Sequence, residues 1–227
     1  MEPLLYTIYY ILYTFLTVYR FHYGLFFFFL LLPTYLIRFS AGLLPMTLLE
    51  GMIWILFLIW LFKEIRIQEK KKCKEFFSYL LSLIKNNKLL FLGSALFLLA
   101  ATISIFTAVD LRSAAGEWKA FYIEPFLLFL ILSHLFTMEQ CDKGTMSLSC
   151  PKNTILFALV LSGLGTSILA IIQHFTGWMV PSAFWENQNT FRVTGWYGFP
   201  NGVGLFLAPL VPLALYGASQ TWKKYKK

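Results

Sequence analysis

Charged side chains are scarce in this sequence. They make up 13% of its 227 residues, whereas 58% are hydrophobic and 19% aromatic, and the mean hydropathy is +0.66. Several apolar runs approach the roughly 20 residues with which a helix crosses the hydrocarbon core of a bilayer. A soluble domain cannot hide such runs, and helices satisfy their own backbone inside lipid. The composition therefore predicts an all-α, polytopic membrane helix bundle.

Cysteines and catalytic motifs are also few or lacking. The three cysteines, Cys73, Cys141 and Cys150, match no metal-ligand spacing, and their odd number does not fit a disulfide framework, so we expect reduced thiols. The sequence holds no zinc motif, no Ser-His-Asp set and no Walker loop. His134 and His174 are expected at opposite ends of their spans, and so in no common site. We expect neither a metal nor another cofactor.

Basic residues outnumber acidic ones by 19 to 11, and their positions explain why. Segment 63–88 is the most basic part of the chain, and a second group of lysines lies at the C-terminus: Lys63, Arg66, Lys70, Lys71, Lys72, Lys74, Lys85 and Lys88, then Lys223, Lys224, Lys226 and Lys227. The positive-inside rule places both in the cytoplasm. The charge thus indicates topology rather than nucleic-acid binding. Segment 63–88 fits an amphipathic surface helix or a solvated linker.

The apolar runs predict about five or six spans in one transmembrane domain, residues 1–227. The clear spans are Met46–Phe62, Leu89–Ala108, Lys119–Phe136, Thr154–Phe175 and a last one from Leu205. The first apolar region, 4–37, forms either a tight hairpin or, as we prefer, an interfacial helix followed by one span that includes Phe21–Gly24. The remaining segments are expected as follows: Arg38–Pro45 and Val109–Trp118 as short loops, 137–153 as cytoplasmic, and 176–203 as an outer loop.

The most distinctive stretch is Phe191–Gly204, FRVTGWYGFPNGVG, a glycine-rich loop that leads into the last span. Pro200-Asn201 predicts a turn onto a helix N-terminus, with Asn201 as the N-cap. A helix N-terminus offers free N–H groups and a partial positive charge, so Arg192 with this loop, including Gly195 and Gly198, fits an anion-binding site. An ordinary interhelical turn with an interfacial arginine fits the same residue types. Pro209 and Pro212 are expected to bend or break the helix that follows, and so to make it discontinuous.

Glu124 is the single residue that most strongly indicates a special role, because a carboxylate inside a span is usually paired or functional. Pro125 follows it and tends to kink the helix at this point. Its candidate partners on the same side of the membrane are Lys119, Arg112 and Arg192. A structural ion pair and a functional carboxylate both fit this pattern.

Aromatic residues are frequent in the predicted outer loop and have two interpretations. They fit an interfacial belt or a surface on which sugar rings stack: Trp178, Phe184, Trp185, Phe191, Trp196 and Tyr197. The sequence alone favours the belt.

Three stretches together resemble the bacterial O-antigen ligase and O-antigen polymerase family. They are PTYLIRFSAGLLPMTLLE at Pro33–Glu50, GEWKAFYIEP at Gly116–Pro125 and RVTGWYGFPNGVGLFLAPLVPL at Arg192–Leu213. The last is the most specific, since members often show an arginine, a glycine-rich step and a Pro-Asn pair before a span. The resemblance covers the chain from about Pro33 onward, in the same order along the sequence.

The resemblance implies an inverting, metal-independent glycosyltransferase of the bacterial inner membrane. Such an enzyme takes a glycan from undecaprenyl diphosphate on the periplasmic side, and Arg192, Gly195, Gly198 and Asn201, with Glu124 and Arg112, would bind the diphosphate or glycan. Family members are longer, and their later loop with a catalytic histidine and arginine has no counterpart here. We therefore expect the N-terminal portion of the family fold, with its catalytic residues unassigned and a partner chain as a source of the missing half.

Two other functions fit the same sequence. A transporter or flippase-like protein would use Glu124 beside Pro125 as its coupling group, and it would depend on a proton or sodium gradient. A non-catalytic membrane scaffold would tolerate replacement of Arg192 or Glu124 with only small changes in stability.

Overall fold

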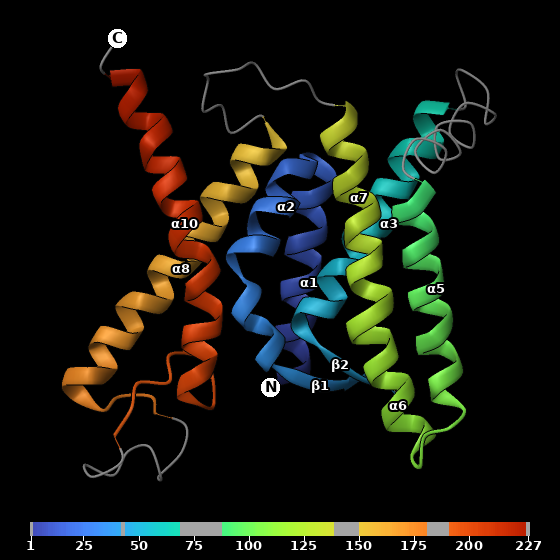
Figure 1. Ribbon diagram of the computed structural model, residues 1–227, viewed down its shortest axis with the longest axis horizontal. Coiled ribbons are helices and arrows are strands. Elements are labelled where there is room, and N and C mark those ends of the chain that lie inside the picture. Colours follow the sequence, from blue (N-terminus) through green and yellow to red (C-terminus); the bar gives the residue numbers. More distant parts are fainter. Residues whose placement is uncertain (1, 42–43, 69–87, 139–149, 181–190, 226–227) are drawn as a thin grey trace. The chain divides into compact units, whose positions relative to one another are not determined.

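The computed structural model describes residues 2–41, 44–68, 88–138, 150–180 and 191–225 and is almost entirely helical (Figure 1). Strands β1 (Arg38–Ala41) and β2 (Leu44–Thr47) form a two-stranded sheet. The predicted all-α class is confirmed. The chain divides into two compact units, Met1–Arg38 with Thr47–Leu49 and Leu135–Lys227, and Phe39–Met46 with Glu50–His134. We call them unit 1 and unit 2 and describe each by itself.

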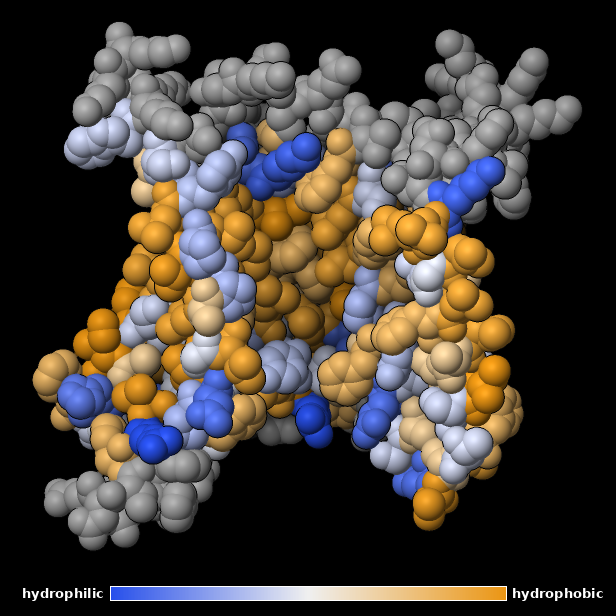
Figure 2. Space-filling view, viewed as in Figure 1, coloured by the Kyte–Doolittle hydropathy of each residue, from blue (hydrophilic) through white to orange (hydrophobic). Residues whose placement is uncertain are grey.

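Four helical segments in the described part of the chain are long and apolar enough to cross a membrane. They are Lys88–Ile105, Leu111–Phe136, Pro151–Thr176 and Pro200–Ser219. Helix α3 (Leu48–Gln68) is also long, but it carries Glu50, Lys63, Glu64 and Arg66. On the face that Figure 2 shows, hydrophobic residues cover the middle of the helices and hydrophilic ones gather toward the helix ends. The chain is a multi-pass membrane protein.

Unit 1 begins with a helical hairpin. Helices α1 (Glu2–Tyr19) and α2 (Phe21–Leu30) are separated by Arg20, whose extended backbone, with φ −143° and ψ 117°, interrupts the helix. The helices pack closely because Gly24 has no side chain and lies against Thr17, while the Tyr13 hydroxyl donates to the Gly24 carbonyl at 3.1 Å. The two helices pack on each other as in the hairpin alternative, and Phe21–Gly24 belongs to the second of them; which of the two crosses the membrane stays a prediction. A 3₁₀ turn, η1 (Leu32–Leu36), follows α2.

Helices α8 (Pro151–Thr176) and α10 (Pro200–Tyr225) complete unit 1 and pack against each other. Gly163 of α8 permits this approach, since a Cβ there would lie 2.9 Å from Leu210 Cδ1. Helix α2 also packs on α8, with the Phe26 and Phe157 rings stacked at 6.1 Å. The expected break at Pro209 and Pro212 is wrong, because α10 continues through both prolines, whereas the alternative of a bend stays a prediction. Membrane helices tolerate the missing hydrogen bonds of proline.

Cys150 directly precedes α8 and is disulfide-bonded, so the expectation of reduced thiols is wrong for this residue. Cys73 and Cys141 lie outside the described residues. The same holds for 69–87 of the predicted basic segment 63–88, for 139–149 of the predicted cytoplasmic segment 137–153, and for 181–190 of the predicted outer loop 176–203.

Unit 2 contains most of the sheet and of α3, then α5 (Lys88–Ile105) and a composite helix. This helix consists of α6 (Leu111–Trp118), a π-helical turn η2 (Lys119–Ile123) and α7 (Glu124–Met138). The two expected loops are therefore corrected: Arg38–Pro45 contributes to the sheet, and most of Val109–Trp118 is helical. Asp110 caps α6, since its Oδ1 accepts hydrogen bonds from the N–H groups of Arg112 at 3.0 Å and Ser113 at 3.3 Å.

Candidate functional site

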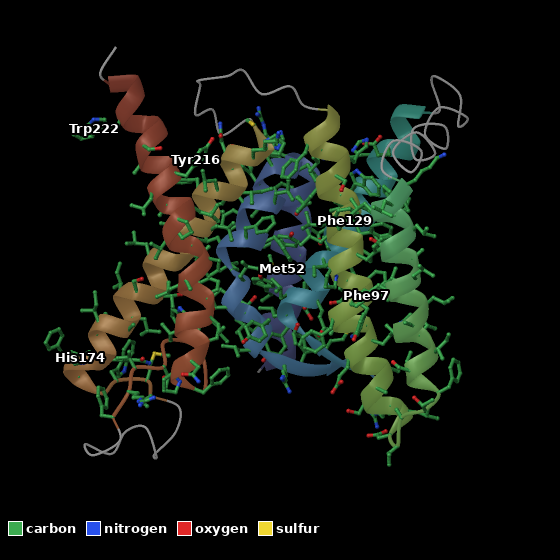
Figure 3. The ribbon with its side chains drawn as sticks, viewed as in Figure 1. Met52, Phe97, Phe129, His174, Tyr216 and Trp222 are labelled. Carbon is green, nitrogen blue, oxygen red and sulfur yellow. The ribbon has the colours of Figure 1, made fainter. Side chains whose placement is uncertain are left out.

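A cavity of about 470 Å³ lies at the start of α10 in unit 1. Its lining combines two polar side chains, His174 and Arg192, with apolar ones and a glycine: Phe191, Val193, Pro200, Val203 and Gly204. Figure 3 shows His174 at the end of α8, beside the loop that leads to α10. Arg192 and His174 are both exposed, so a ligand in the cavity can reach them. The described part of the chain offers no carboxylate partner to Arg192.

The end of α8 sets the position of His174. Gly177 adopts a left-handed backbone, with φ 67°, and its N–H donates to the Gln173 carbonyl at 2.8 Å, which closes the helix. His174 therefore occupies the last turn of α8. Its ring centroid lies 6.2 Å from that of Phe191, a second residue of the cavity.

Gln173, the residue before His174, joins α8 to the loop through its buried side chain. Its Nε2 donates to the carbonyls of Met179 at 3.1 Å and Gly195 at 2.9 Å. Its Oε1 accepts from the N–H groups of Thr194 at 3.1 Å and Gly195 at 2.7 Å. A primary amide has two N–H donors and two acceptor lone pairs, so its hydrogen-bonding capacity is filled.

The loop segment that Gln173 holds is itself buried. Gly195 has φ 55°, a conformation that favours glycine, and a Cβ there would lie 3.0 Å from Val203 Cγ2 and 3.4 Å from Thr166 Cγ2. Thr194 is fully buried, and its Oγ1 has no hydrogen-bond partner among the described residues. The backbone around Gly195 therefore follows the surface of α8 closely.

Helix α10 begins at Pro200, so Asn201 lies inside its first turn and is not the predicted N-cap. Proline is favoured at the first helical position because its missing N–H would have no intrahelical partner. Gly202 faces Tyr197, whose Cβ would lie 2.7 Å from a Cβ at Gly202. Burial raises the pKa of Tyr197. The first turn of α10 thus packs on the loop through Tyr197, while its positive dipole end lies beside the cavity that Val203 and Gly204 line.

Of the six predicted binding residues, one lines this cavity. This residue is Arg192. Gly195 is a buried residue of the loop, and Gly198 and Asn201 are exposed; none of these three is part of the lining. Arg112 and Glu124 belong to unit 2, so the two groups of residues are described separately.

Glu124 is almost completely buried in unit 2, at 1% exposure. Its Oε1 accepts a hydrogen bond from Trp54 Nε1 of α3 at 3.1 Å. Lys119, one of its predicted partners, instead forms an ion pair with Glu50 at 2.7 Å, although Lys119 and Glu50 both lie close enough to act on Glu124 electrostatically. Arg112 is exposed on α6.

The π-helical turn η2 brings the Glu124 N–H to the Lys119 carbonyl, directly before Pro125. Such turns accommodate local irregularities of a helix.

A second polar contact in unit 2 joins α3 to α7. Trp60 Nε1 donates to His134 Nδ1 at 3.2 Å, and His134 Nε2 lies 3.7 Å from Glu64 Oε2. His134 is therefore a packed residue of the α3–α7 contact, and it belongs to the other unit than His174.

The cavity combines hydrogen-bond donors with a mostly apolar lining. A guanidinium, an imidazole and a helix N-terminus suit an anion, and the apolar walls suit a hydrocarbon chain attached to it. No group of three His, Cys, Asp or Glu side chains that could hold a metal ion occurs within the described ranges.

Sequence reasoning missed Gln173 and set His174 aside. The sequence does contain a signal for Gln173. Like the Glu124 carboxylate, its polar side chain lies in an apolar span and needs a hydrogen-bond partner there. Its partners, however, lie up to 22 residues away in the sequence, and no local pattern marks them.

Comparisons of the chain with models of protein families, with curated protein sequences and with solved structures find no significant match.

Proposed function

We propose that this chain is an O-antigen ligase-like or polymerase-like glycosyltransferase component that handles undecaprenyl-diphosphate-linked glycans. The cavity at the start of α10 would receive the diphosphate. One observation carries the proposal: Arg192 and His174 line a single cavity at the N-terminus of a 26-residue helix.

The two polar side chains suit a diphosphate for different reasons. Arginine binds phosphate oxygens in a bidentate manner, and histidine can donate a further hydrogen bond. The dipole at the N-terminus of α10 adds a favourable field. Because the other lining residues are apolar or glycine, the same cavity also suits the first isoprene units of the carrier lipid.

The resemblance of Arg192–Leu213 to the family supports the same assignment, since this stretch supplies both Arg192 and the start of α10. The proposal includes a bacterial inner-membrane location with the cavity on the periplasmic side. The lysines of the C-terminal tail, on the opposite end of α10, support that orientation.

Binding to the purified chain in lipid nanodiscs tests the proposal. We expect native mass spectrometry to show tighter binding of undecaprenyl diphosphate than of undecaprenyl monophosphate. The variant Arg192→Gln should weaken binding by roughly tenfold or more, because a hydrogen bond to a charged group contributes about 1.5–3 kcal/mol. Arg20→Gln, a change of another exposed arginine of unit 1 that does not line the cavity, is the matched control and should bind as the wild type does.

A cellular measurement tests the transfer reaction. In the native host, Arg192→Gln should reduce the surface glycan and cause the lipid-linked glycan to accumulate. Equal binding of both lipids, or wild-type affinity of Arg192→Gln, would contradict the proposal.

A transporter or flippase-like function is the second candidate, and the burial of Glu124 favours it. This carboxylate lies close to a second carboxylate, Glu50, as well as to the ammonium group of Lys119. A buried carboxylate inside a membrane segment suits a coupling proton or cation. Uptake into proteoliposomes that depends on a proton or sodium gradient, and that Glu124→Gln abolishes, would favour this candidate over glycosyl transfer, which needs no gradient.

A further inference from the structure

We infer that Gln173 is a positioning residue, which fixes Arg192 relative to His174 across the cavity at the start of α10. The inference rests on the proposed function only for the identity of the ligand. The contacts of the Gln173 amide with the loop carry the rest.

Hydrogen bonds of the Gln173 side chain connect the turn that carries His174 to the backbone near Arg192. Gln173 lies next to His174 on α8, and two of its bonds hold Thr194 and Gly195, which follow Arg192 by two and three residues. The backbone that carries Arg192 is therefore bound to the same helical turn that carries His174. A change in these bonds changes the separation of the two polar side chains of the cavity.

Gln173 also binds both ends of the loop between α8 and α10. Met179 lies three residues after the end of α8, whereas Gly195 lies five residues before the start of α10, and Gln173 Nε2 donates to both of their carbonyls. Met179 has a positive φ of 59°, which is unusual for a residue with a side chain. Its carbonyl receives the Gln173 hydrogen bond in that conformation, so the amide stabilises an unfavourable backbone at one end and a glycine backbone, φ 55°, at the other.

Gln173 is placed to position other residues and not to bind a ligand itself. Gln173 is fully buried, its donors and acceptors are all used, and it does not line the cavity. It therefore has nothing to offer a ligand directly. Its effect on a ligand must act through Arg192 and His174, which a shift of about 1 Å can displace from a productive geometry.

Hydrogen exchange tests the clamp without any ligand. We expect the wild-type amides of Thr194 and Gly195 to exchange slowly, and Gln173→Met to abolish this protection in the peptide that covers 191–199. Gln173→Glu retains an acceptor for both amides but cannot donate to Met179 or Gly195, so its protection should be intermediate. Ser162→Ala removes another buried polar side chain of α8 that holds no part of the loop, and it is the matched control.

Binding then tests the positioning role, with undecaprenyl diphosphate in nanodiscs as the probe. Gln173→Met should weaken binding per folded molecule by about tenfold or more, whereas Ser162→Ala should remain within about twofold of the wild type. Helical circular dichroism measures the folded fraction. If Gln173→Met does not fold, Gln173→Glu gives the same comparison, with a smaller loss expected.

The outcomes of the two measurements are distinct. Unchanged protection in both Gln173 variants would overturn the clamp, and lost protection with wild-type affinity would overturn the positioning role and leave Gln173 a residue of loop stability alone. Failure of the wild-type chain to bind the lipid diphosphate would instead overturn the proposed function. In that case cleavage by trypsin after Arg192 still tests the clamp, because Gln173→Met should accelerate it and equal rates would contradict the inference.

Discussion

At the scale of single residues, three glycines of the stretch Phe191–Gly204 have different physical roles. Gly195 adopts a left-handed backbone. Its N–H donates a hydrogen bond to Gln173 Oε1, and its carbonyl accepts one from Gln173 Nε2. At Gly202 there is no room for a side chain, because Tyr197 occupies that space. Gly198 is exposed, and a Cβ there would meet nothing within 4 Å. The sequence marks all three as glycines of one loop, and only their contacts separate them.

This difference predicts unequal effects of the same substitution. Gly202→Ala should destabilise unit 1 by about 1–3 kcal/mol, because its Cβ would lie 2.7 Å from Tyr197 Cβ, an atom that cannot move without the backbone. Gly198→Ala should stay within about 0.5 kcal/mol of the wild type. Denaturant unfolding in detergent compares them, and equal losses of stability would contradict the contact.

The Glu50–Lys119 ion pair gives a second prediction at this scale. Both side chains are largely buried, with 11% and 15% exposure. Lys119→Met should destabilise unit 2 by about 3–5 kcal/mol, since it removes the ammonium group that is paired with a buried carboxylate. Adding Glu50→Gln to Lys119→Met should recover a large part of that loss. A double mutant as unstable as the single one would show that the charge of Glu50 is not the cause.

Part of this cluster could be predicted from the sequence. A carboxylate inside an apolar run must find a partner, so the importance of Glu124 follows from physical chemistry alone. The choice of partner does not, because Trp54 lies 70 residues away in the sequence and only tertiary packing brings it to Glu124. The same limit applies to Gln173, whose four bonds depend on where the loop returns.

At the scale of elements, helix existence was easier to predict than helix ends. The expected spans Leu89–Ala108 and Thr154–Phe175 correspond to α5, Lys88–Ile105, and α8, Pro151–Thr176. Hydrophobic runs of this length leave few alternatives in lipid. The segment LRSAAGEW was mistaken for a loop because it is polar, although Asp110 before it is a favourable N-cap. The sheet β1–β2 depends on hydrogen bonds between two strands. The order of polar and apolar residues within one segment does not show which other segment it pairs with.

The cap of α6 gives a prediction at this scale. Asp110→Ala removes the acceptor of the Arg112 and Ser113 amides and should cost about 1 kcal/mol, whereas Asp110→Asn keeps a side-chain oxygen and should cost much less. Hydrogen exchange of the first turn of α6 measures the effect directly. Equal protection in the Ala and Asn variants would contradict capping by this side chain.

At the scale of the whole molecule, composition was sufficient for the class of protein. A chain with 58% hydrophobic residues has to place its apolar helices in lipid, and four described segments have the required length. The proposed function depends on a smaller part of the chain, a cavity of seven lining residues at the start of α10. Arg192 of this cavity was expected from the sequence, whereas the contribution of His174 required the structure.

The most direct test of the central claim is site-specific photocrosslinking in cells. A benzophenone side chain at Phe191, which lines the cavity, should form an adduct with a lipid-linked diphosphate glycan, and the additional change Arg192→Ala should abolish it. The same probe at Leu215, an exposed residue of α10 that does not line the cavity, is the matched control. Adducts of equal yield at both positions, or an adduct at Phe191 that persists without Arg192, would contradict the account.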